Sequence, residues 1–102
     1  REQQVALVGD IRKMYNSIHI KILEQHCHRF LWRVLEAHDP DVYSITRVNM
    51  GDRPAAAIGA EAIYMTADMN AAKYPEVARL LKLSTYVDDI VYSVPDMTKA
   101  LF

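Results

Sequence analysis

The amino-acid sequence predicts an α+β fold in which a small antiparallel sheet is backed by helices. A short apolar run closed by an aspartate, and two apolar triplets separated by two further aspartates, have the β-branched and aromatic composition of strands. Two other stretches begin at prolines, which are favoured at the first position of a helix. The apolar run with its aspartate covers residues 5–10, and the two triplets with their aspartates cover residues 85–92. The two expected helices follow Pro54 and Pro75.

The composition is that of one ordinary domain or of a piece of one. The chain has 102 residues, of which 51% are hydrophobic and 25% are charged. Twelve Lys and Arg residues against thirteen Asp and Glu residues give a formal net charge of −1. The basic residues are scattered, so the chain lacks the basic patch with which nucleic-acid-binding domains contact phosphates. No apolar run approaches the ~20 residues of a membrane span, and no membrane partner is expected.

Residues 5–9 are predicted to form a buried strand, because this apolar run is too short for a core helix and is rich in strand-forming residues. Asp10 follows the run and is therefore expected at the carboxyl end of the strand. Residues 11–28 mix polar and apolar side chains with only weak helical spacing, so turns and short helical pieces are expected there.

A second pair of strands is expected between residues 29 and 48. Residues 29–33 have the composition of a strand, and residues 38–41 have the composition of a turn. Residues 42–48 alternate between two faces. This alternation predicts a hairpin of two half-buried strands.

The triplet His26, Cys27 and His28 suggests a metal site at first sight. Three consecutive side chains point in different directions on any regular element, however, whereas zinc ligands are spaced over a loop or a helical turn. We therefore interpret the triplet as ordinary surface or core residues. Cys27 is the only cysteine, which excludes a disulfide within the chain and fits a reducing, cytoplasmic compartment.

Two helices are expected in the second half of the chain. Residues 51–54, Gly-Asp-Arg-Pro, break the chain and predict the start of a helix that runs to about Ala71. Its many small residues would let it lie close to a sheet, and its buried bulk is expected from Ile58, Ile63, Met65 and Met69. Residues 74–76, Tyr-Pro-Glu, start the second helix, whose inner face is expected to carry Val77, Leu80 and Leu81.

The apolar triplets at residues 85–87 and 90–92 predict a β-hairpin. Only Asp88 and Asp89 separate them, which is the length of a two-residue hairpin turn. Residues 95–97, Pro-Asp-Met, open a final helix.

Two aspartates at the tip of an apolar hairpin are unusual, because like charges repel and such a turn can use Asn-Gly instead. A cation is therefore expected beside Asp88 and Asp89. Asp10 ends another apolar strand, and if the strands are neighbours all three carboxylates meet at one edge of the sheet. Oxygen ligands on rigid elements suit Mg²⁺, with Mn²⁺ as an alternative, and two ions ~3.5 to 4 Å apart serve phosphoryl transfer. The alternative is that Asp10 caps a helix and the other two form a solvated turn.

Residues 86–89, Tyr-Val-Asp-Asp, resemble the Tyr-x-Asp-Asp hairpin of reverse transcriptases. Residues 9–15 resemble the first catalytic strand of these enzymes, in which an aspartate is followed five residues later by an aromatic residue. The order and separation of the two motifs identify this family more specifically than either motif alone. Residues 29–33, 46–51 and 73–76 resemble the palm of Pao/BEL-type retrotransposons in particular, so the resemblance covers essentially the whole chain.

This resemblance implies that residues 1–102 are the palm segment of an RNA-directed DNA polymerase, without its fingers, thumb and connection. It implies two-metal nucleotidyl transfer from a deoxynucleoside triphosphate to a primer 3′-hydroxyl on an RNA or DNA template. The partners would be this nucleic acid and the rest of a retrotransposon polyprotein, including fingers, thumb and ribonuclease H. The location would be cytoplasmic, within virus-like particles.

The resemblance also assigns roles near the metal ions. The catalytic metal ligands would be Asp10, Asp88 and Asp89. Ile11 would offer a backbone carbonyl to a metal. The backbone N–H groups of Lys13 and Met14 would face the incoming triphosphate.

Further residues would contact the nucleotide and the primer. Tyr15 matches the aromatic steric gate, whose ring excludes a 2′-hydroxyl; an ordinary buried aromatic residue is the alternative. Tyr86 would lie near the primer terminus, while Gly51 and Pro54 would shape the loop and helix beneath the nascent base pair. Met50 stands where many reverse transcriptases have a glutamine, and the distance from Gly51 to Pro54 is two residues shorter than the commoner pattern. These departures speak against a side-chain contact to the nucleotide from position 50.

Two other functions remain open on the sequence. One is a catalytically inactive remnant of a retroelement that acts as a binding or structural domain; the intact aspartates argue against long decay. The other is a different Mg²⁺-dependent nucleotidyl transferase or cyclase on a similar palm. Tyr15 and the hairpin at Tyr86 favour the polymerase over this second alternative.

Overall fold

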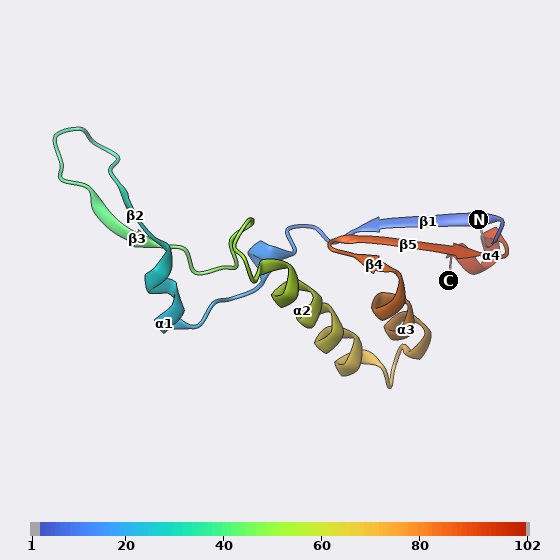
Figure 1. The fold of residues 1–102 in the computed structure, drawn as a ribbon. Helices are drawn as coiled ribbons and strands as arrows, with labels where there is room; N and C mark the ends of the chain where they lie inside the picture. Colours follow the sequence, from blue (N-terminus) through green and yellow to red (C-terminus); the bar gives the residue numbers. More distant parts are fainter. Residues whose placement is uncertain (1–2, 102) are drawn as a thin grey trace. The chain divides into compact units, whose positions relative to one another are not determined.

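The chain forms two units in the computed structural model, which describes residues 3–101. Unit 1 comprises Arg1–Met14 and Ala56–Phe102, and unit 2 comprises Tyr15–Ala55. Both contain helical segments and antiparallel strands, so the small α+β class expected from the sequence is confirmed (Figure 1). Of the helices described, none has the length and apolar character required to cross a membrane.

The sheet of unit 1 has three antiparallel strands in the order β1-β5-β4. Their bounds are Val5–Asp10 for β1, Asp89–Val94 for β5 and Thr85–Tyr86 for β4. β1 pairs with β5 along its whole length, ending with Asp10 opposite Asp89 (Figure 1). The prediction of a fully buried first strand is wrong, because its side chains alternate between half-buried and exposed, and Val8 is 76% exposed. Among residues 3–101, cover is found on only one face of this strand.

Helices lie against this sheet. α2 spans Ala55–Asn70, α3 spans Pro75–Ser84 and α4 spans Met97–Leu101. The first two begin where the prolines predicted them, directly after Pro54 and at Pro75. α3 contacts β4 and β5, while α4 contacts β1 and β5. The predicted backing of the sheet by a helix is therefore confirmed for α3, the helix at Pro75, whereas the backing by α2 stays a prediction.

The buried faces of α2 and α3 differ from the prediction. The buried residues of α2 follow a spacing of four: Ala55, Gly59, Ile63 and Ala67. Of the predicted bulk only Ile63 is buried, whereas the other three residues are exposed, namely Ile58 (38%), Met65 (58%) and Met69 (82%). In α3 the buried residue is Ala78. Leu80 and Leu81, expected on the inner face, are half-buried, whereas Val77, also expected there, is 51% exposed. The buried positions of both helices hold mostly small residues, because small side chains let a helix approach its neighbours closely. Most of the larger side chains therefore lie on the outer faces.

The turn of the β4–β5 hairpin is formed by Val87 and Asp88, one residue earlier than predicted. Tyr86 pairs with Asp89, so Asp89 belongs to β5 and not to the turn. Val87 has a φ of 58°. A two-residue hairpin turn requires positive φ at its first central position, a conformation that a β-branched residue rarely adopts.

Unit 2 contains the second hairpin, as predicted. β2 (Arg29–Trp32) pairs antiparallel with β3 (Asp41–Ser44) (Figure 1). The connecting loop covers residues 33–40, so it starts before the predicted turn, and the second strand ends before residue 48. Three short helical pieces precede the hairpin, as expected for residues 11–28: η1 (Tyr15–Ser17), α1 (Ile22–Gln25) and η2 (His26–His28).

The strands of the second hairpin are not half-buried as predicted. Every residue of β2 is exposed, and in β3 only Ser44 is partly covered. Phe30 and Tyr43 stack across the pair, with ring centroids 5.7 Å apart. A two-stranded ribbon leaves both faces open unless another element covers one of them, and alternation alone cannot show whether such an element exists.

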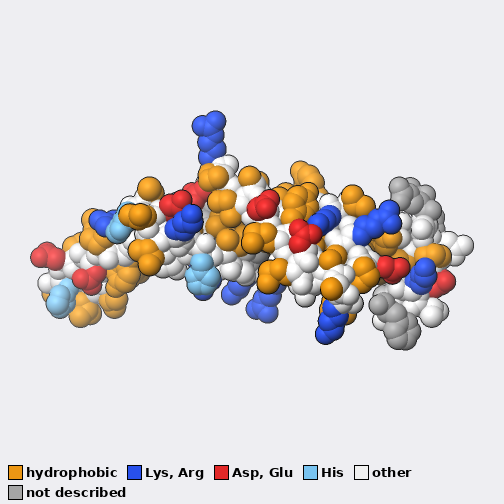
Figure 2. Space-filling view, turned by 90° about the horizontal axis from the view of Figure 1, so that it is seen from below, with side chains coloured by type: hydrophobic (Ala, Val, Ile, Leu, Met, Phe, Trp, Pro, Cys, Tyr) orange, Lys and Arg blue, Asp and Glu red, His pale blue; other side chains and the backbone are white. Residues whose placement is uncertain are grey.

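Hydrophobic and charged side chains are mixed on the surface. Figure 2 shows hydrophobic side chains over the visible face, with Lys, Arg, Asp and Glu interspersed among them. No basic patch gathers on this face, in keeping with the formal net charge of −1.

Replacing Val87 with glycine is expected to stabilise the chain by about 1 kcal/mol, because glycine adopts positive φ without the steric cost that valine carries. Little packing is lost, since Val87 is 43% exposed. Urea unfolding of both proteins measures the difference. The matched control is Val91→Gly, at an exposed position of β5, which should destabilise by about 1 kcal/mol. Equal destabilisation by the two substitutions would show that the turn is not strained.

Candidate metal centre

Three carboxylates meet at one end of the unit 1 sheet. Asp10 is the last residue of β1, Asp89 is the first residue of β5, and Asp88 lies in the turn between β4 and β5. One oxygen from each side chain lies within 4.8 Å of the other two. The sequence predicted that the three carboxylates would meet if the two strands were neighbours. β1 and β5 are neighbours, and the three side chains do lie together.

A backbone hydrogen bond closes this end of the sheet. The N–H of Ile11 donates to the carbonyl oxygen of Asp88 at 2.7 Å. It continues the β1–β5 pairing one step beyond the pair of Asp10 and Asp89. The turn is thereby fixed against the residue that follows Asp10, and the relative position of the three aspartates is set by backbone contacts.

The backbone is strained on both sides of the aspartates. Among the described residues other than glycine, only Lys13 (φ 54°) and Val87 (φ 58°) have positive φ. One lies three residues after Asp10 and the other directly precedes Asp88. Such conformations persist only where the surrounding structure enforces them, and they concentrate at functional sites. The sequence did not single out Val87; a valine in a two-residue turn is the signal that could have done so.

The site is open to solvent. Asp10 and Asp89 are exposed and Asp88 is half-buried. At separations of 4 to 5 Å, two carboxylates repel by about 1 kcal/mol in water and by more where the surroundings are less polar. The cluster is therefore tolerable without an ion, but it favours a cation.

The chemistry of these ligands fits Mg²⁺ or Mn²⁺. Magnesium binds oxygen at about 2.1 Å in an octahedron, so two ligand oxygens on one ion are at most about 4.2 Å apart. The three carboxylate oxygens lie within 4.8 Å of one another, so small side-chain rotations would bring them to such separations. Open positions facing solvent could take water or phosphate oxygens.

The predicted backbone groups near the metals are partly engaged within the chain. The carbonyl oxygen of Ile11 accepts a hydrogen bond from the N–H of Met14 at 3.2 Å. A carbonyl has a second lone pair, so the Ile11 oxygen can still contact a cation. The N–H of Met14 can donate to a triphosphate only if it also keeps, or gives up, its hydrogen bond to the Ile11 carbonyl oxygen. Lys13 is exposed. The proposed roles of Ile11, Lys13 and Met14 stay predictions.

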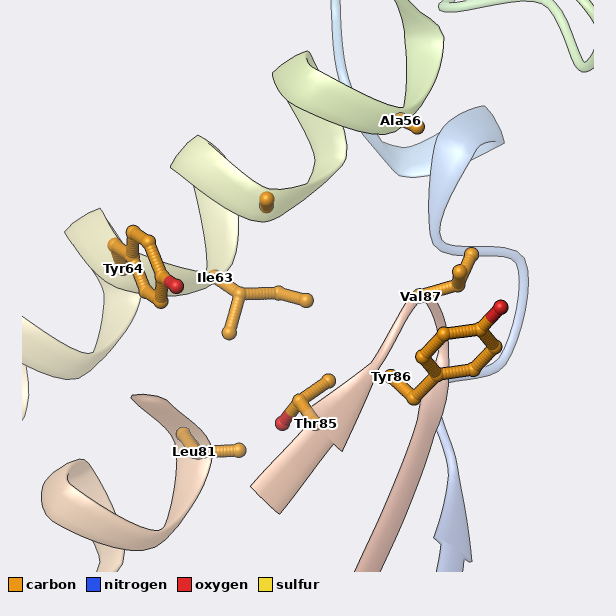
Figure 3. A pocket seen from close by; sticks show the side chains of 8 residues that line it. Ala56, Ile63, Tyr64, Leu81, Thr85, Tyr86 and Val87 are labelled. Atoms are coloured by element: carbon orange, nitrogen blue, oxygen red, sulfur yellow. The ribbon is translucent and has the colours of Figure 1, made fainter. Parts of the chain in front are cut away.

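Tyr86 lies at the rim of a cavity beside the hairpin. The cavity has a volume of about 270 Å³ and is lined by residues of α2, α3 and β4 together with Val87. Figure 3 shows Ile63 and Leu81 pointing toward Thr85 across this space. The hydroxyl of Thr85 is buried without a hydrogen-bond partner. Tyr86 itself is 78% exposed, so its ring is free to contact another molecule.

The remaining predicted residues belong to unit 2. Tyr15 begins η1 and is partly buried. Gly51 and Pro54 are exposed in the turn before α2, where Gly51 has a φ of 93° that glycine adopts without strain. Their predicted contacts with a nucleotide stay predictions.

Mg²⁺ is expected to stabilise the folded chain through this site. For roughly millimolar affinity, about 10 mM ion stabilises the native state by about 1.4 kcal/mol, a melting shift of a few degrees. Asp88→Asn should raise the stability without metal, because it removes one like charge, and should reduce the response to Mg²⁺.

Thermal melting with and without Mg²⁺ at matched ionic strength measures both effects. Asp39→Asn, at an exposed position of the unit 2 loop, is the control and should respond to Mg²⁺ like the unaltered chain. If Asp88→Asn lowers the stability without metal, or responds to Mg²⁺ as fully as the control, the three carboxylates do not share an ion.

No protein-family model matches the chain, and no curated protein is significantly similar to it. The function proposed below therefore rests on the sequence motifs and on the geometry of the acidic cluster.

Proposed function

We propose that the chain is the palm segment of a Pao/BEL-type reverse transcriptase and that the acidic cluster binds the two divalent ions of nucleotidyl transfer. One observation carries the proposal. The aspartate that ends the first strand and the Asp-Asp pair of the Tyr-Val-Asp-Asp hairpin, far apart in the sequence, lie within 4.8 Å of one another. Both motifs that resemble those of reverse transcriptases thus contribute to one site.

The proposed reaction joins a deoxynucleotide to a primer. The primer 3′-hydroxyl loses its proton to solvent and its oxygen attacks the α-phosphate of a deoxynucleoside triphosphate. The bond from the α-phosphorus to the oxygen that bridges it to the β-phosphate breaks, and pyrophosphate leaves. Two divalent ions, if bound there, would make the 3′-hydroxyl a better nucleophile and would neutralise charge on the phosphates. Asp10 and Asp89 would hold the ions from paired strands, and Asp88 would complete the set from the turn.

Other residues have proposed roles in binding the nucleotide and the primer. Tyr15 excludes the 2′-hydroxyl of a ribonucleotide, and Tyr86 contacts the primer terminus, for which its 78% exposure leaves room. Gly51 and Pro54 shape the surface beneath the nascent base pair. The backbone of Ile11, Lys13 and Met14 contributes to the metal and triphosphate contacts.

The proposal includes contacts with the rest of a polyprotein. The second hairpin exposes large apolar side chains, among them Leu31 (66%) and Trp32 (59%). Apolar surface of this kind marks contacts with other protein segments. Because the formal charge is −1, the proposal assigns most contacts to template and primer phosphates to other segments, such as fingers and thumb.

Primer extension tests the proposal directly. A polymerase that contains this segment with its fingers and thumb is expected to extend a DNA primer on an RNA template with Mg²⁺. Asp89→Asn should reduce the rate at least about a hundredfold, because it removes a metal ligand, while Asp39→Asn should not. The 102-residue chain alone is expected to be inactive, since template binding is then unsupported. An inactive polymerase, or an active chain on its own, would contradict the proposal.

Sugar selectivity tests the role of Tyr15. In the same polymerase, Tyr15→Val should keep part of the deoxynucleotide activity and admit ribonucleotides, because it removes steric bulk and no metal ligand. Single-nucleotide incorporation of a deoxynucleotide and of its ribonucleotide counterpart measures the ratio. Tyr64→Val, at an exposed tyrosine of α2, serves as the control and should leave it unchanged. Unchanged selectivity in Tyr15→Val would leave Tyr15 an ordinary packing residue.

A further inference from the structure

An interaction within unit 2 joins two segments that are distant in the sequence. The Nε2 atom of His28 lies 2.7 Å from Oδ2 of Asp52. Both side chains are mostly buried, with exposed fractions of 24% and 26%. His28 ends η2, directly before β2, whereas Asp52 lies in the turn that leads to α2. The two residues before His28 do not share this contact. Nδ1 of His26 lies beside the Arg29 side chain, and Cys27 is exposed.

The backbones of both residues are anchored. The carbonyl oxygen of His28 accepts the N–H of Ile45 at 3.1 Å, which ties it to the residue after β3. The N–H of Asp52 donates to Asn49 at 3.3 Å, and the carbonyl oxygen of Asp52 accepts the N–H of Ala55 at 3.0 Å. Asp52 is thus the centre of the turn, and its side chain connects this turn to the base of the second hairpin.

The geometry also specifies the tautomer of His28. A carboxylate only accepts hydrogen bonds, so Nε2 carries the hydrogen. Nδ1 is buried without a hydrogen-bond partner. The ring hydrogen is therefore expected on Nε2, where the carboxylate accepts it, and not on Nδ1, where it would be a buried donor without an acceptor.

We propose that His28 is a positioning residue for the turn of residues 51–54, which it holds in place through Asp52. This inference rests on the proposed function, in which Gly51 and Pro54 lie beneath the nascent base pair. His28 then controls the affinity for the incoming nucleotide without touching it. Removing the contact loosens the turn and weakens nucleotide binding, while the chemistry at the three aspartates is unaffected.

Hydrogen exchange of the 102-residue chain tests the hold of His28 on the turn, independently of any activity. His28→Phe keeps the volume of the ring but removes the donor, and the Ala55 amide should then exchange roughly tenfold faster. His28→Gln places an amide N–H near the position of Nε2 and should restore slow exchange. His38→Phe, at an exposed histidine of the loop, should have no effect, and the amides of β1 should be unchanged in every variant.

Ring ¹⁵N resonances of the unaltered chain should show Nε2 protonated and Nδ1 bare. Unchanged exchange in His28→Phe, equal acceleration in His28→Gln, or a hydrogen on Nδ1 in place of Nε2 would overturn the positioning contact.

Steady-state kinetics of the longer polymerase test the consequence for nucleotide binding. His28→Phe should raise KM for the deoxynucleotide roughly tenfold with kcat nearly unchanged, the pattern of lost ground-state binding. His28→Gln should restore KM. An unchanged KM in an active polymerase would overturn the role of His28 and leave the proposed function standing. An inactive unaltered polymerase would overturn the proposed function, while the exchange measurement still decides whether His28 holds the turn.

Discussion

The antiparallel pairing of β1 with β5 determines where every side chain of the acidic cluster lies. This pairing places Asp10 directly opposite Asp89, and the hydrogen bond from Ile11 to Asp88 extends it by one step. A shift of one residue would move the side chains of a strand to the opposite face and separate the carboxylates. The alternation of half-buried and exposed residues along β1 opposes such a shift, because the half-buried residues would then become exposed. The register of a small apolar sheet therefore fixes the geometry of a charged site at its end.

The position of Asp88 adds a second constraint. It lies in a two-residue turn whose first residue, Val87, adopts a conformation unfavourable for a β-branched side chain. The strain in the turn and the repulsion between the carboxylates both oppose the observed arrangement, and a divalent cation would relieve the repulsion. The cluster is at the surface, where water moderates this repulsion, so the fold can form before an ion binds.

Much of this structure follows from local chemistry in the sequence. The apolar run that ends at Asp10, the hairpin near Asp88 and the helix starts at the prolines are each encoded by neighbouring residues. The sequence also predicted that the three aspartates would lie together, on the condition that their strands are adjacent. The position of the turn was not predicted, because neither position offers the Gly or Asn that usually marks positive φ. The buried faces of the helices and the pairing of His28 with Asp52 depend on contacts between distant segments, which no local pattern specifies.

Asp10, Asp88 and Asp89 are proposed to form one site for a divalent cation. Titration of the 102-residue chain with Mn²⁺, followed by amide NMR, tests it most directly, because this paramagnetic ion broadens the signals of nearby nuclei. The account predicts that the signals of these aspartates and of Ile11 are lost first, and that excess Mg²⁺ restores them by competition. Broadening that begins equally at other exposed acidic residues, such as Asp39 and Glu76, or that Mg²⁺ does not reverse, would contradict it.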